Sequence, residues 1–248
     1  MVETALDIYL DAFVAPRRHE LDSPVVLNAP GVRGVALIRL LGSDDSGYDR
    51  FVAEVNGPGR GVVFVLDQAP RCNEFMRTQP GWSGHSEMAM VLRDIQAVSG
   101  SEPPNGLVLR PVIRGSADNE QAVSLKRAAD VAIASDPSAP TSPEEVISWL
   151  SGLPDSVRVF AAVDQKGIAH ATAACHVFGE YTQIFFVSTE PEWRRRGIGH
   201  AMTVGVLRAA ASLGARHAIL HATEDGLSVY KRIGFEPIGM LTRYSRDE

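Results

Sequence analysis

The chain has 248 residues, with 24 basic and 30 acidic side chains and a formal net charge of −6 at pH 7. This length accommodates one large domain or two small ones. A composition of 45% hydrophobic and 22% charged residues is typical of a soluble globular protein. The acidic balance argues against a non-specific nucleic-acid binder, so we expect no nucleic-acid partner.

The cysteines and the N-terminal residues indicate the cellular compartment in which the protein is expected to act. The chain has two cysteines, Cys72 and Cys175, and no CxxC pair, so neither a disulfide framework nor a cysteine-based zinc site is expected. The N-terminus carries Glu3, Asp7 and Asp11 instead of a basic segment followed by an apolar one, which argues against a signal peptide. No uncharged apolar stretch is long enough to cross a bilayer. We expect a cytoplasmic protein with no membrane partner.

The first hundred residues predict a small α/β domain. The expected elements are a helix at 3–14, a strand at 35–41, a helix at 48–55, a strand at 61–66, a short helix at 74–78 and a strand at 87–92. Their last strand–helix–strand succession is similar to the end of the chain, and we interpret this half as a truncated, degenerate copy of the C-terminal unit. A stretch of small residues, two prolines and Asn-Gly at 99–106 is typical of a linker. We predict domains at 1–100 and 107–248, joined by a linker at 101–106.

The C-terminal half shows a clearer pattern. Ser142, Pro143 and Glu145 form the signature of a capping box that opens a helix. Glycines follow two further helical segments, at Gly214 and Gly234. The remaining predictions are strands at 107–112, 157–163, 168–178, 181–188, 217–223 and 236–245, and helices at 117–134, 200–213 and 227–233. The order predicts an α/β (α+β) fold with a mixed, mostly antiparallel sheet and helices on both faces.

The segment Arg194-Arg195-Arg196-Gly197-Ile198-Gly199 is the most informative feature of the sequence. It lies between an apolar strand and a helix. Glycines allow backbone N–H groups to surround an anion, and the helix N-terminus adds the positive end of its dipole. Arginines supply charge suited to phosphate. We therefore expect this arginine–glycine loop (residues 194–199) to bind a diphosphate.

Three kinds of protein commonly bind a diphosphate in this way. A P-loop requires Lys followed by Ser or Thr after the last glycine, whereas His200 and Ala201 follow here. A dinucleotide-binding loop has the pattern GxGxxG, and the third glycine is missing. The remaining candidate is coenzyme A.

The residues resemble those of a known family. Arg194-x-x-Gly197-x-Gly199 resembles the acyl-CoA loop RxxGxG/A of the GNAT superfamily of N-acyltransferases, and residues 229–235, VYKRIGF, resemble its LYxxLGF segment. The resemblance covers 107–245 and implies the GNAT fold, with acetyl-CoA as acyl donor and no metal. One departure is Thr223, which lies near the position where many members have asparagine. The extra N-terminal half resembles tandem members in which one copy has lost the ability to bind the cofactor.

The resemblance also assigns roles to residues. Tyr230 would be the general acid that protonates the departing thiolate. Glu180 is the first candidate for the base that accepts the proton of the amine, and His176, His221 and Glu224 are weaker ones. A backbone N–H near Val187 and Ser188 would hold the oxyanion. The expected cofactor-binding residues are Val187, Thr189, Arg194, Arg195, Arg196, Gly197, Ile198, Gly199, His200, Thr223 and Tyr230.

These roles predict an N-acetyltransferase that moves an acetyl group to a primary amine by direct attack in a ternary complex. A small-molecule amine is the preferred acceptor, and a protein or peptide amine is the alternative. A non-catalytic acyl-CoA-binding regulatory module is a third reading, against which the presence of Tyr230 argues. The family builds its acceptor pocket from the first two helices, here about 117–150. A monomer or a homodimer is expected.

Overall fold

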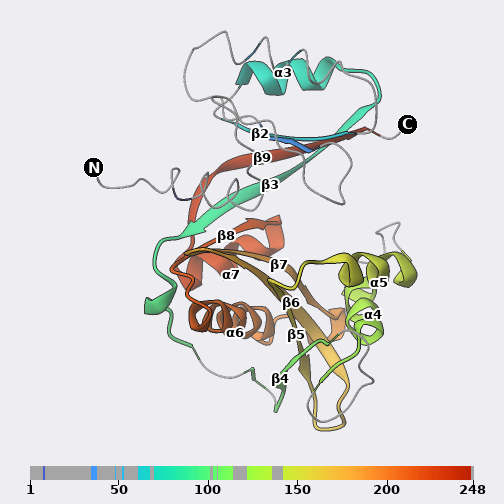
Figure 1. The fold of residues 1–248 in the computed structure, drawn as a ribbon, viewed down its shortest axis with the longest axis vertical. Coiled ribbons are helices and arrows are strands. Elements are labelled where there is room, and N and C mark those ends of the chain that lie inside the picture. The colour runs from blue at the N-terminus through green and yellow to red at the C-terminus, as the bar shows by residue number, and fades with distance from the viewer. Residues whose placement is uncertain are drawn as a thin grey trace. The chain divides into compact units, whose positions relative to one another are not determined.

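The computed structural model describes residues 61–67, 70–100, 103–104, 106–113, 122–135 and 142–246, together with residues 35–37 and residues 8, 48 and 52 (Figure 1). The chain divides into two compact units. One comprises the residues up to Val91 together with 221–227 and 236–248, and the other comprises 92–220 and 228–235.

The second unit contains the arginine–glycine loop and is built on a mixed sheet with the strand order β8-β7-β6-β5-β4. Neighbouring strands in it are antiparallel except for β7 and β8, which are parallel. Its strands are β4 (Val108–Pro111), β5 (Val157–Val163), β6 (Ala169–Phe178), β7 (Tyr181–Thr189) and β8 (His217–Ala222), the last two residues of which group with the first unit.

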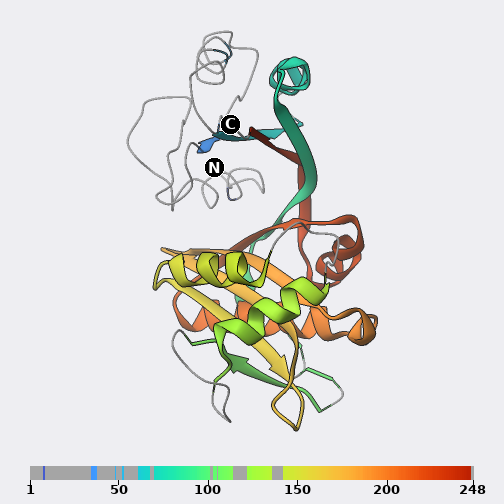
Figure 2. The ribbon, with the colours of Figure 1, turned by 90° about the vertical axis from the view of Figure 1, so that its right-hand side faces the viewer.

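Helices cover both faces of this sheet. Figure 1 shows α6 (Ile198–Ser212) on one side of the strands and α4 (Leu125–Ser135) with α5 (Pro143–Gly152) on the other, and Figure 2 views this arrangement from the side of α4 and α5. Both α4 and α6 contact β6 and β7. With helices on both sides, residues 169–175 of β6 are all buried, which explains why five of these seven residues are alanine or cysteine. The predicted fold class is confirmed.

The first unit contains the strand order β1-β2-β9-β3. Its elements are β1 (Val35–Leu37), β2 (Gly61–Leu66), α3 (Pro70–Thr78), β3 (Trp82–Leu92) and β9 (Glu236–Arg246). Strand β9 pairs antiparallel with both β2 and β3. The last strand of the chain therefore completes the N-terminal sheet, and this division differs from the predicted one, in which 107–248 forms a domain by itself.

Several element boundaries differ from prediction for local reasons. The helix expected at 117–134 begins only at Leu125, because Val123 pairs with Val112 as an extended bridge. Helix α6 begins at Ile198 instead of residue 200. Helix α7 (Glu224–Ile233) begins three residues earlier than predicted, because Thr223 accepts the amide of Gly226 at the helix start. The capping box at Ser142 and Glu145 is confirmed.

The predicted N-terminal elements agree in part. The helix expected at 74–78 extends from Pro70, and the strand expected at 87–92 begins at Trp82. Most of the helices at 3–14 and 48–55, and residues 38–41, lie outside the described residues. The relation of this half to the C-terminal unit as a degenerate copy stays a prediction.

Candidate active site

The arginine–glycine loop connects the short 3₁₀ turn η3 (Pro191–Trp193) to the N-terminus of α6. Arg195 and Gly197 both have left-handed backbone conformations, with φ of 59° and 78°. Gly197 is the N-cap residue and no side chain caps the helix. The first helical hydrogen bond runs from the Ala201 N–H to the Gly197 carbonyl, so the amides of residues 198–200 precede the first bonded one. The turn therefore presents backbone N–H groups and a helix dipole to an anion.

Space for an approaching group is present at Gly199. A Cβ built on Gly199 would meet no atom within 4 Å, whereas one on Gly197 would lie 3.9 Å from Pro104 Cγ. Packing of the protein itself thus does not require a glycine at 199. Open space beside a helix N-terminus is what a diphosphate needs in order to reach the backbone closely.

The three arginines of the loop have different surroundings. Arg194 donates from Nε to the Thr189 carbonyl over 3.1 Å and from Nη2 to the Ser135 carbonyl. Arg196 donates from Nη2 to the Glu192 carbonyl over 2.8 Å, and its guanidinium lies 5.0 Å from the centre of the Trp193 ring. Arg195 is exposed and makes no hydrogen bond within the described part of the chain. Of the three, Arg195 alone makes no hydrogen bond to the described residues, while Arg194 and Arg196 also donate to backbone carbonyls.

Strand β7 carries a β-bulge before it reaches the loop. The register with β6 passes from Thr172 opposite Ser188 to Ala174 opposite Phe185, so Phe186 and Val187 both lie opposite Ala173. Phe186 has φ of 56°, a rare conformation for a bulky residue. The buried Thr172 hydroxyl donates to the Phe186 carbonyl over 3.2 Å and stabilises the bulge. Such bulges redirect backbone groups and are frequent beside active sites.

On the side that faces β8, strand β7 is paired over only part of its length. Strands β7 and β8 pair over three positions, from Tyr181 opposite His217 to Gln183 opposite Ile219. Beyond Gln183, β7 has no registered partner in β8 among the described residues. The six residues from Ile184 to Thr189 thus form an edge that leads directly to the arginine–glycine loop. Val187 and Thr189, two of the predicted contact residues, belong to this edge.

Tyr230 lies in α7 and belongs to the same compact unit as the bulge and the loop. Its side chain is 8% exposed and its ring meets Phe235 edge to face, with centroids 6.0 Å apart. The Tyr230 carbonyl accepts the amide of Phe235 over 3.0 Å, which fixes the end of the helix. Thr223 groups with the other unit, where its hydroxyl accepts the Gly226 amide at 3.3 Å.

Glu180, the first candidate base, lies at the opposite end of β7 from the loop. Its carbonyl accepts the amides of Arg216 and His217, and its half-exposed carboxylate is 3.9 Å from His217 Nε2. Val187 lies seven positions further along the chain, which corresponds to about 20 Å of strand. The structure does not bring Glu180 together with the bulge. Among the weaker candidates, His176 packs edge to face on Phe178, and Glu224 is exposed in the first turn of α7.

The two cysteines are buried, and burial raises the pKa of each thiol to about 11, although Arg71 beside Cys72 and Arg158 beside Cys175 act in the opposite direction. At neutral pH only about one molecule in ten thousand would carry a given thiolate. Cysteine chemistry at these positions is therefore disfavoured.

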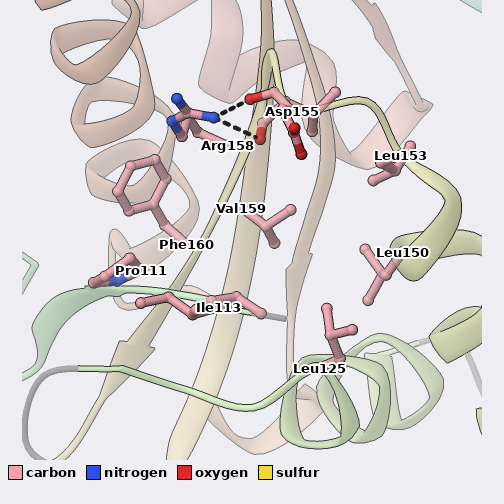
Figure 3. A pocket seen from close by; sticks show the side chains of 11 residues that line it. Pro111, Ile113, Leu125, Leu150, Leu153, Asp155, Arg158, Val159 and Phe160 are labelled. Carbon is pink, nitrogen blue, oxygen red and sulfur yellow. Dashed lines mark hydrogen bonds between the residues drawn. The ribbon is translucent and has the colours of Figure 1, made fainter. Parts of the chain in front are cut away.

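A pocket of about 510 Å³ opens between α4, α5 and the outer edge of the sheet (Figure 3). Figure 3 shows Leu125, Leu150 and Val159 facing it, and the guanidinium of Arg158 held by backbone carbonyls of Asp155 and Val157. The pocket is therefore lined largely by apolar side chains, with the oppositely charged residues Asp155 and Arg158 at one end. Its remaining lining residues are Pro111, Val112, Ile113, Leu153 and Phe160.

An aromatic group lies between this pocket and the bulge. Trp149, which precedes Leu150 in α5, is 47% exposed and has its ring 5.9 Å from that of Phe185 and 5.6 Å from that of Phe186. Sequence reasoning missed both this group and Thr172. A bulge and a contact between helix and strand depend on register, which one sequence does not reveal. The only signal in the sequence was the pair of adjacent aromatic residues, Phe185 and Phe186, in the strand that precedes the arginine–glycine loop.

The part of the chain that the structure describes contains no helix long and apolar enough to span a bilayer. Nor does it contain three or more histidine, cysteine, aspartate or glutamate side chains grouped closely enough to hold a metal ion.

Comparison with known proteins adds a matching domain model and a fold. Residues 155–237 match the acetyltransferase (GNAT) domain. A comparison with curated proteins returns no match. Among solved structures, a GCN5-related N-acetyltransferase from Kribbella flavida has a TM-score of 0.63 at 19% identity, covering 100% of this chain and 97% of that one.

Two other solved structures share the fold. A functionally unknown conserved protein from Staphylococcus epidermidis has a TM-score of 0.66 at 14% identity, over 99% of this chain and 98% of its own. A GCN5-related N-acetyltransferase from Sphaerobacter thermophilus has a TM-score of 0.58 at 16% identity, over 82% of this chain and 64% of its own. At such identities these similarities establish the fold alone. Residues 155–237 thus match the GNAT acetyltransferase domain, within a chain whose fold is similar to those of these solved structures.

Proposed function

We propose that the protein is an N-acetyltransferase that moves the acetyl group of acetyl-CoA to a primary amine of a small molecule. The observation that carries this proposal is the continuity of three features along the chain: the unpaired edge of β7, the arginine–glycine loop and the uncapped N-terminus of α6. We further propose that it acts in the cytoplasm as a monomer or homodimer, without nucleic-acid or membrane partners.

The acyl donor would occupy this continuous path. The amides of residues 195–199 suit its diphosphate, with Arg195 as the available cation. The edge from Ile184 to Thr189 offers backbone groups to the amides of the pantetheine arm, as an added strand would use them. At the bulge, backbone N–H groups near Val187 and Ser188 would stabilise the oxyanion that forms on the thioester carbonyl.

The chemistry follows from a direct attack. The amine nitrogen forms a bond to the thioester carbon, the carbon–sulfur bond breaks, and the sulfur leaves as a thiolate that Tyr230 protonates. Full proton transfer from a tyrosine with an ordinary pKa of about 10 to a thiolate of about 8.5 costs about 2 kcal/mol. Tyr230 therefore acts first as a hydrogen-bond donor to the developing charge. The raised pKa values of both thiols favour this route over one through an acyl-cysteine.

The acceptor has to lose a proton before it attacks. For an amine with a pKa near 10.4 this costs about 4–5 kcal/mol at pH 7. Because Glu180 lies about 20 Å along the strand from the bulge, we do not propose it as the group that removes this proton directly. The proton would leave through water or another side chain near the bulge.

The acceptor amine would bind beside α5. Val159 lies opposite Ala174 of β6, which in turn lies opposite Phe185, so pocket and bulge are two strand spacings, about 10 Å, apart. Trp149 and Leu150 extend from one to the other. We propose an acceptor with an apolar body seated against these side chains and its amino group directed to the bulge.

Two measurements test the proposal. Calorimetry of the purified protein with acetyl-CoA should detect binding, and release of free thiol should accelerate with small apolar amines. If only peptide amines accelerate the release of thiol, the proposed class of acceptor is wrong, but the proposed acetyl transfer is retained. Binding of acetyl-CoA without turnover on any amine would favour a regulatory acyl-CoA-binding module instead.

A further inference from the structure

A buried histidine outside the proposed path of the acyl donor joins three segments of the second unit. His170 lies in β6 and is 8% exposed. Its Nδ1 is 2.7 Å from Glu190 Oε2, and its Nε2 is 3.3 Å from Asp164 Oδ2. Asp164 begins the turn between β5 and β6, and Glu190 follows β7 immediately. The imidazole thus bridges two carboxylates that come from opposite sides of its strand.

Further hydrogen bonds hold both carboxylates close to the ring. Asp164 cannot easily turn away, because its Oδ1 accepts the amides of Lys166 and Ile168 over 2.8 and 2.9 Å. The His170 carbonyl also accepts the Glu190 amide over 3.0 Å. Backbone and side chain therefore hold Glu190 to β6 together.

The ring also contacts the turn that leads to the arginine–glycine loop. His170 stacks on Trp193 with centroids 4.0 Å apart and planes at 20°. The guanidinium of Arg196 lies 5.0 Å from the centre of the same indole. Glu190 is the N-cap residue of η3 and Trp193 is its last residue, so His170 contacts both ends of this turn.

We propose that His170 is a positioning residue, which sets the conformation of the arginine–glycine loop by fixing η3 through Glu190 and Trp193. Trp193 transmits the constraint to Arg196 within the loop. The consequence for catalysis rests on the proposed function, because it assumes that this loop binds acetyl-CoA. The structural part concerns the free protein and is testable separately.

Hydrogen exchange followed by NMR tests the structural part in the free protein. The informative amides are those of Trp193, Arg194 and Ala201, which donate to the carbonyls of Glu190, Pro191 and Gly197. In His170→Phe the ring can still stack on Trp193 but forms neither hydrogen bond. These three amides should exchange at least tenfold faster, while the Val157 amide, which donates to Pro154, keeps its rate. His85→Phe, at an exposed histidine 3.9 Å from Glu87, is the matched control and should change none of them.

Kinetics tests the functional part. The KM for acetyl-CoA should rise at least fivefold in His170→Phe, with kcat at saturation within twofold of the wild type. Glu190→Gln, which retains a hydrogen-bonding side chain, should give a smaller rise in KM. Unchanged exchange and KM in a folded His170→Phe would overturn the proposal, and if that variant does not fold, the same measurements on Glu190→Gln and Trp193→Leu decide. Absence of acetyl-CoA binding by the wild type would refute the proposed function and leave the exchange result to judge the positioning role.

Discussion

Arg194 donates from Nε to the carbonyl of Thr189, the last residue of β7, over 3.1 Å. Its Nη2 donates to the carbonyl of Ser135, the last residue of α4. A residue expected to pair with a diphosphate is thus engaged with two backbone carbonyls. The guanidinium joins the end of a helix to the end of the strand from which the arginine–glycine loop departs.

This geometry predicts that Arg194 acts on acetyl-CoA binding through the shape of the loop. Arg194→Ala should weaken the affinity about tenfold, the equivalent of about 1.4 kcal/mol, because two charge-assisted hydrogen bonds are lost. Arg194→Lys should weaken it nearly as much, since an ammonium retains the charge but lacks the fork that reaches both carbonyls. Calorimetry on the three proteins measures this. Wild-type affinity in Arg194→Lys would show that charge alone matters.

The two glycines of the loop are predicted to differ. Gly199 has ordinary φ and open space, so Gly199→Ala should leave the melting temperature unchanged or raise it, as alanine favours helix by about 1 kcal/mol. Its affinity for acetyl-CoA should nevertheless fall at least tenfold, because the methyl group fills the space that the diphosphate needs. Gly197→Ala should lower stability by about 1–2 kcal/mol, because φ there is 78°.

Thermal unfolding and calorimetry on both variants separate the two effects. Normal affinity in a folded Gly199→Ala would place the diphosphate elsewhere.

The sequence predicted the second unit well where local signals decide the structure. The capping box at Ser142 and the glycine that ends α7 are each encoded by a few adjacent residues. The assignment of β9 to the N-terminal sheet depends instead on pairing across more than 150 residues, as in the contact of Ser86 with Thr242. No local pattern reports such a pairing.

The same distinction applies to the site. The arginine–glycine loop is a contiguous motif, and its position between strand and helix could be predicted. The roles of its arginines could not, because Arg194 binds a carbonyl 59 residues away in the chain. The bulge at Phe186 depends on Thr172 in the neighbouring strand, and no spacing in the sequence indicates it.

Tyr230 is predicted to act in turnover and not in binding. Tyr230→Phe should lower kcat by about 10²-fold, the lower range for general acid catalysis, and leave the Kd of acetyl-CoA within about threefold. Tyr244→Phe is the matched control: its hydroxyl donates to Asn73 Oδ1 over 3.1 Å in the other unit, so its loss should affect stability only. Thiol release and calorimetry measure both quantities. Equal kcat in Tyr230→Phe and wild type would remove the hydroxyl from the chemistry.

Trp149 is predicted to select the acceptor. Trp149→Ala should raise the KM for an apolar amine about tenfold, because an exposed aromatic contact is lost, and leave the Kd of acetyl-CoA unchanged. Leu213→Ala removes a similarly exposed apolar side chain at the end of α6 and should change neither. A KM unaffected by Trp149→Ala would separate the acceptor from α5.

Asp164 predicts a pH dependence of stability. Burial raises the pKa of this carboxyl, but hydrogen bonds from the Ile168 amide, the His170 ring and the Lys166 amide, with the charge of His170, outweigh it and hold the pKa below the ordinary 3.8. A pKa lower in the folded than in the unfolded protein means that ionised Asp164 stabilises the fold above about pH 4. That stabilisation is lost as the pH falls through the folded-state value.

Asp164→Asn should therefore unfold at lower urea concentration than the wild type between about pH 5 and 7, with the difference in unfolding free energy shrinking below about pH 4. Asp130→Asn is the control for the loss of a carboxylate. Asp130 forms an ion pair with Lys126 over 3.1 Å on the surface of α4, and this pair does not involve β6. Since a surface pair of this kind contributes little, its removal should change the free energy by less than about 1 kcal/mol. A difference for Asp164→Asn that stays constant down to about pH 2 would show that the ionised carboxylate is not the stabilising form.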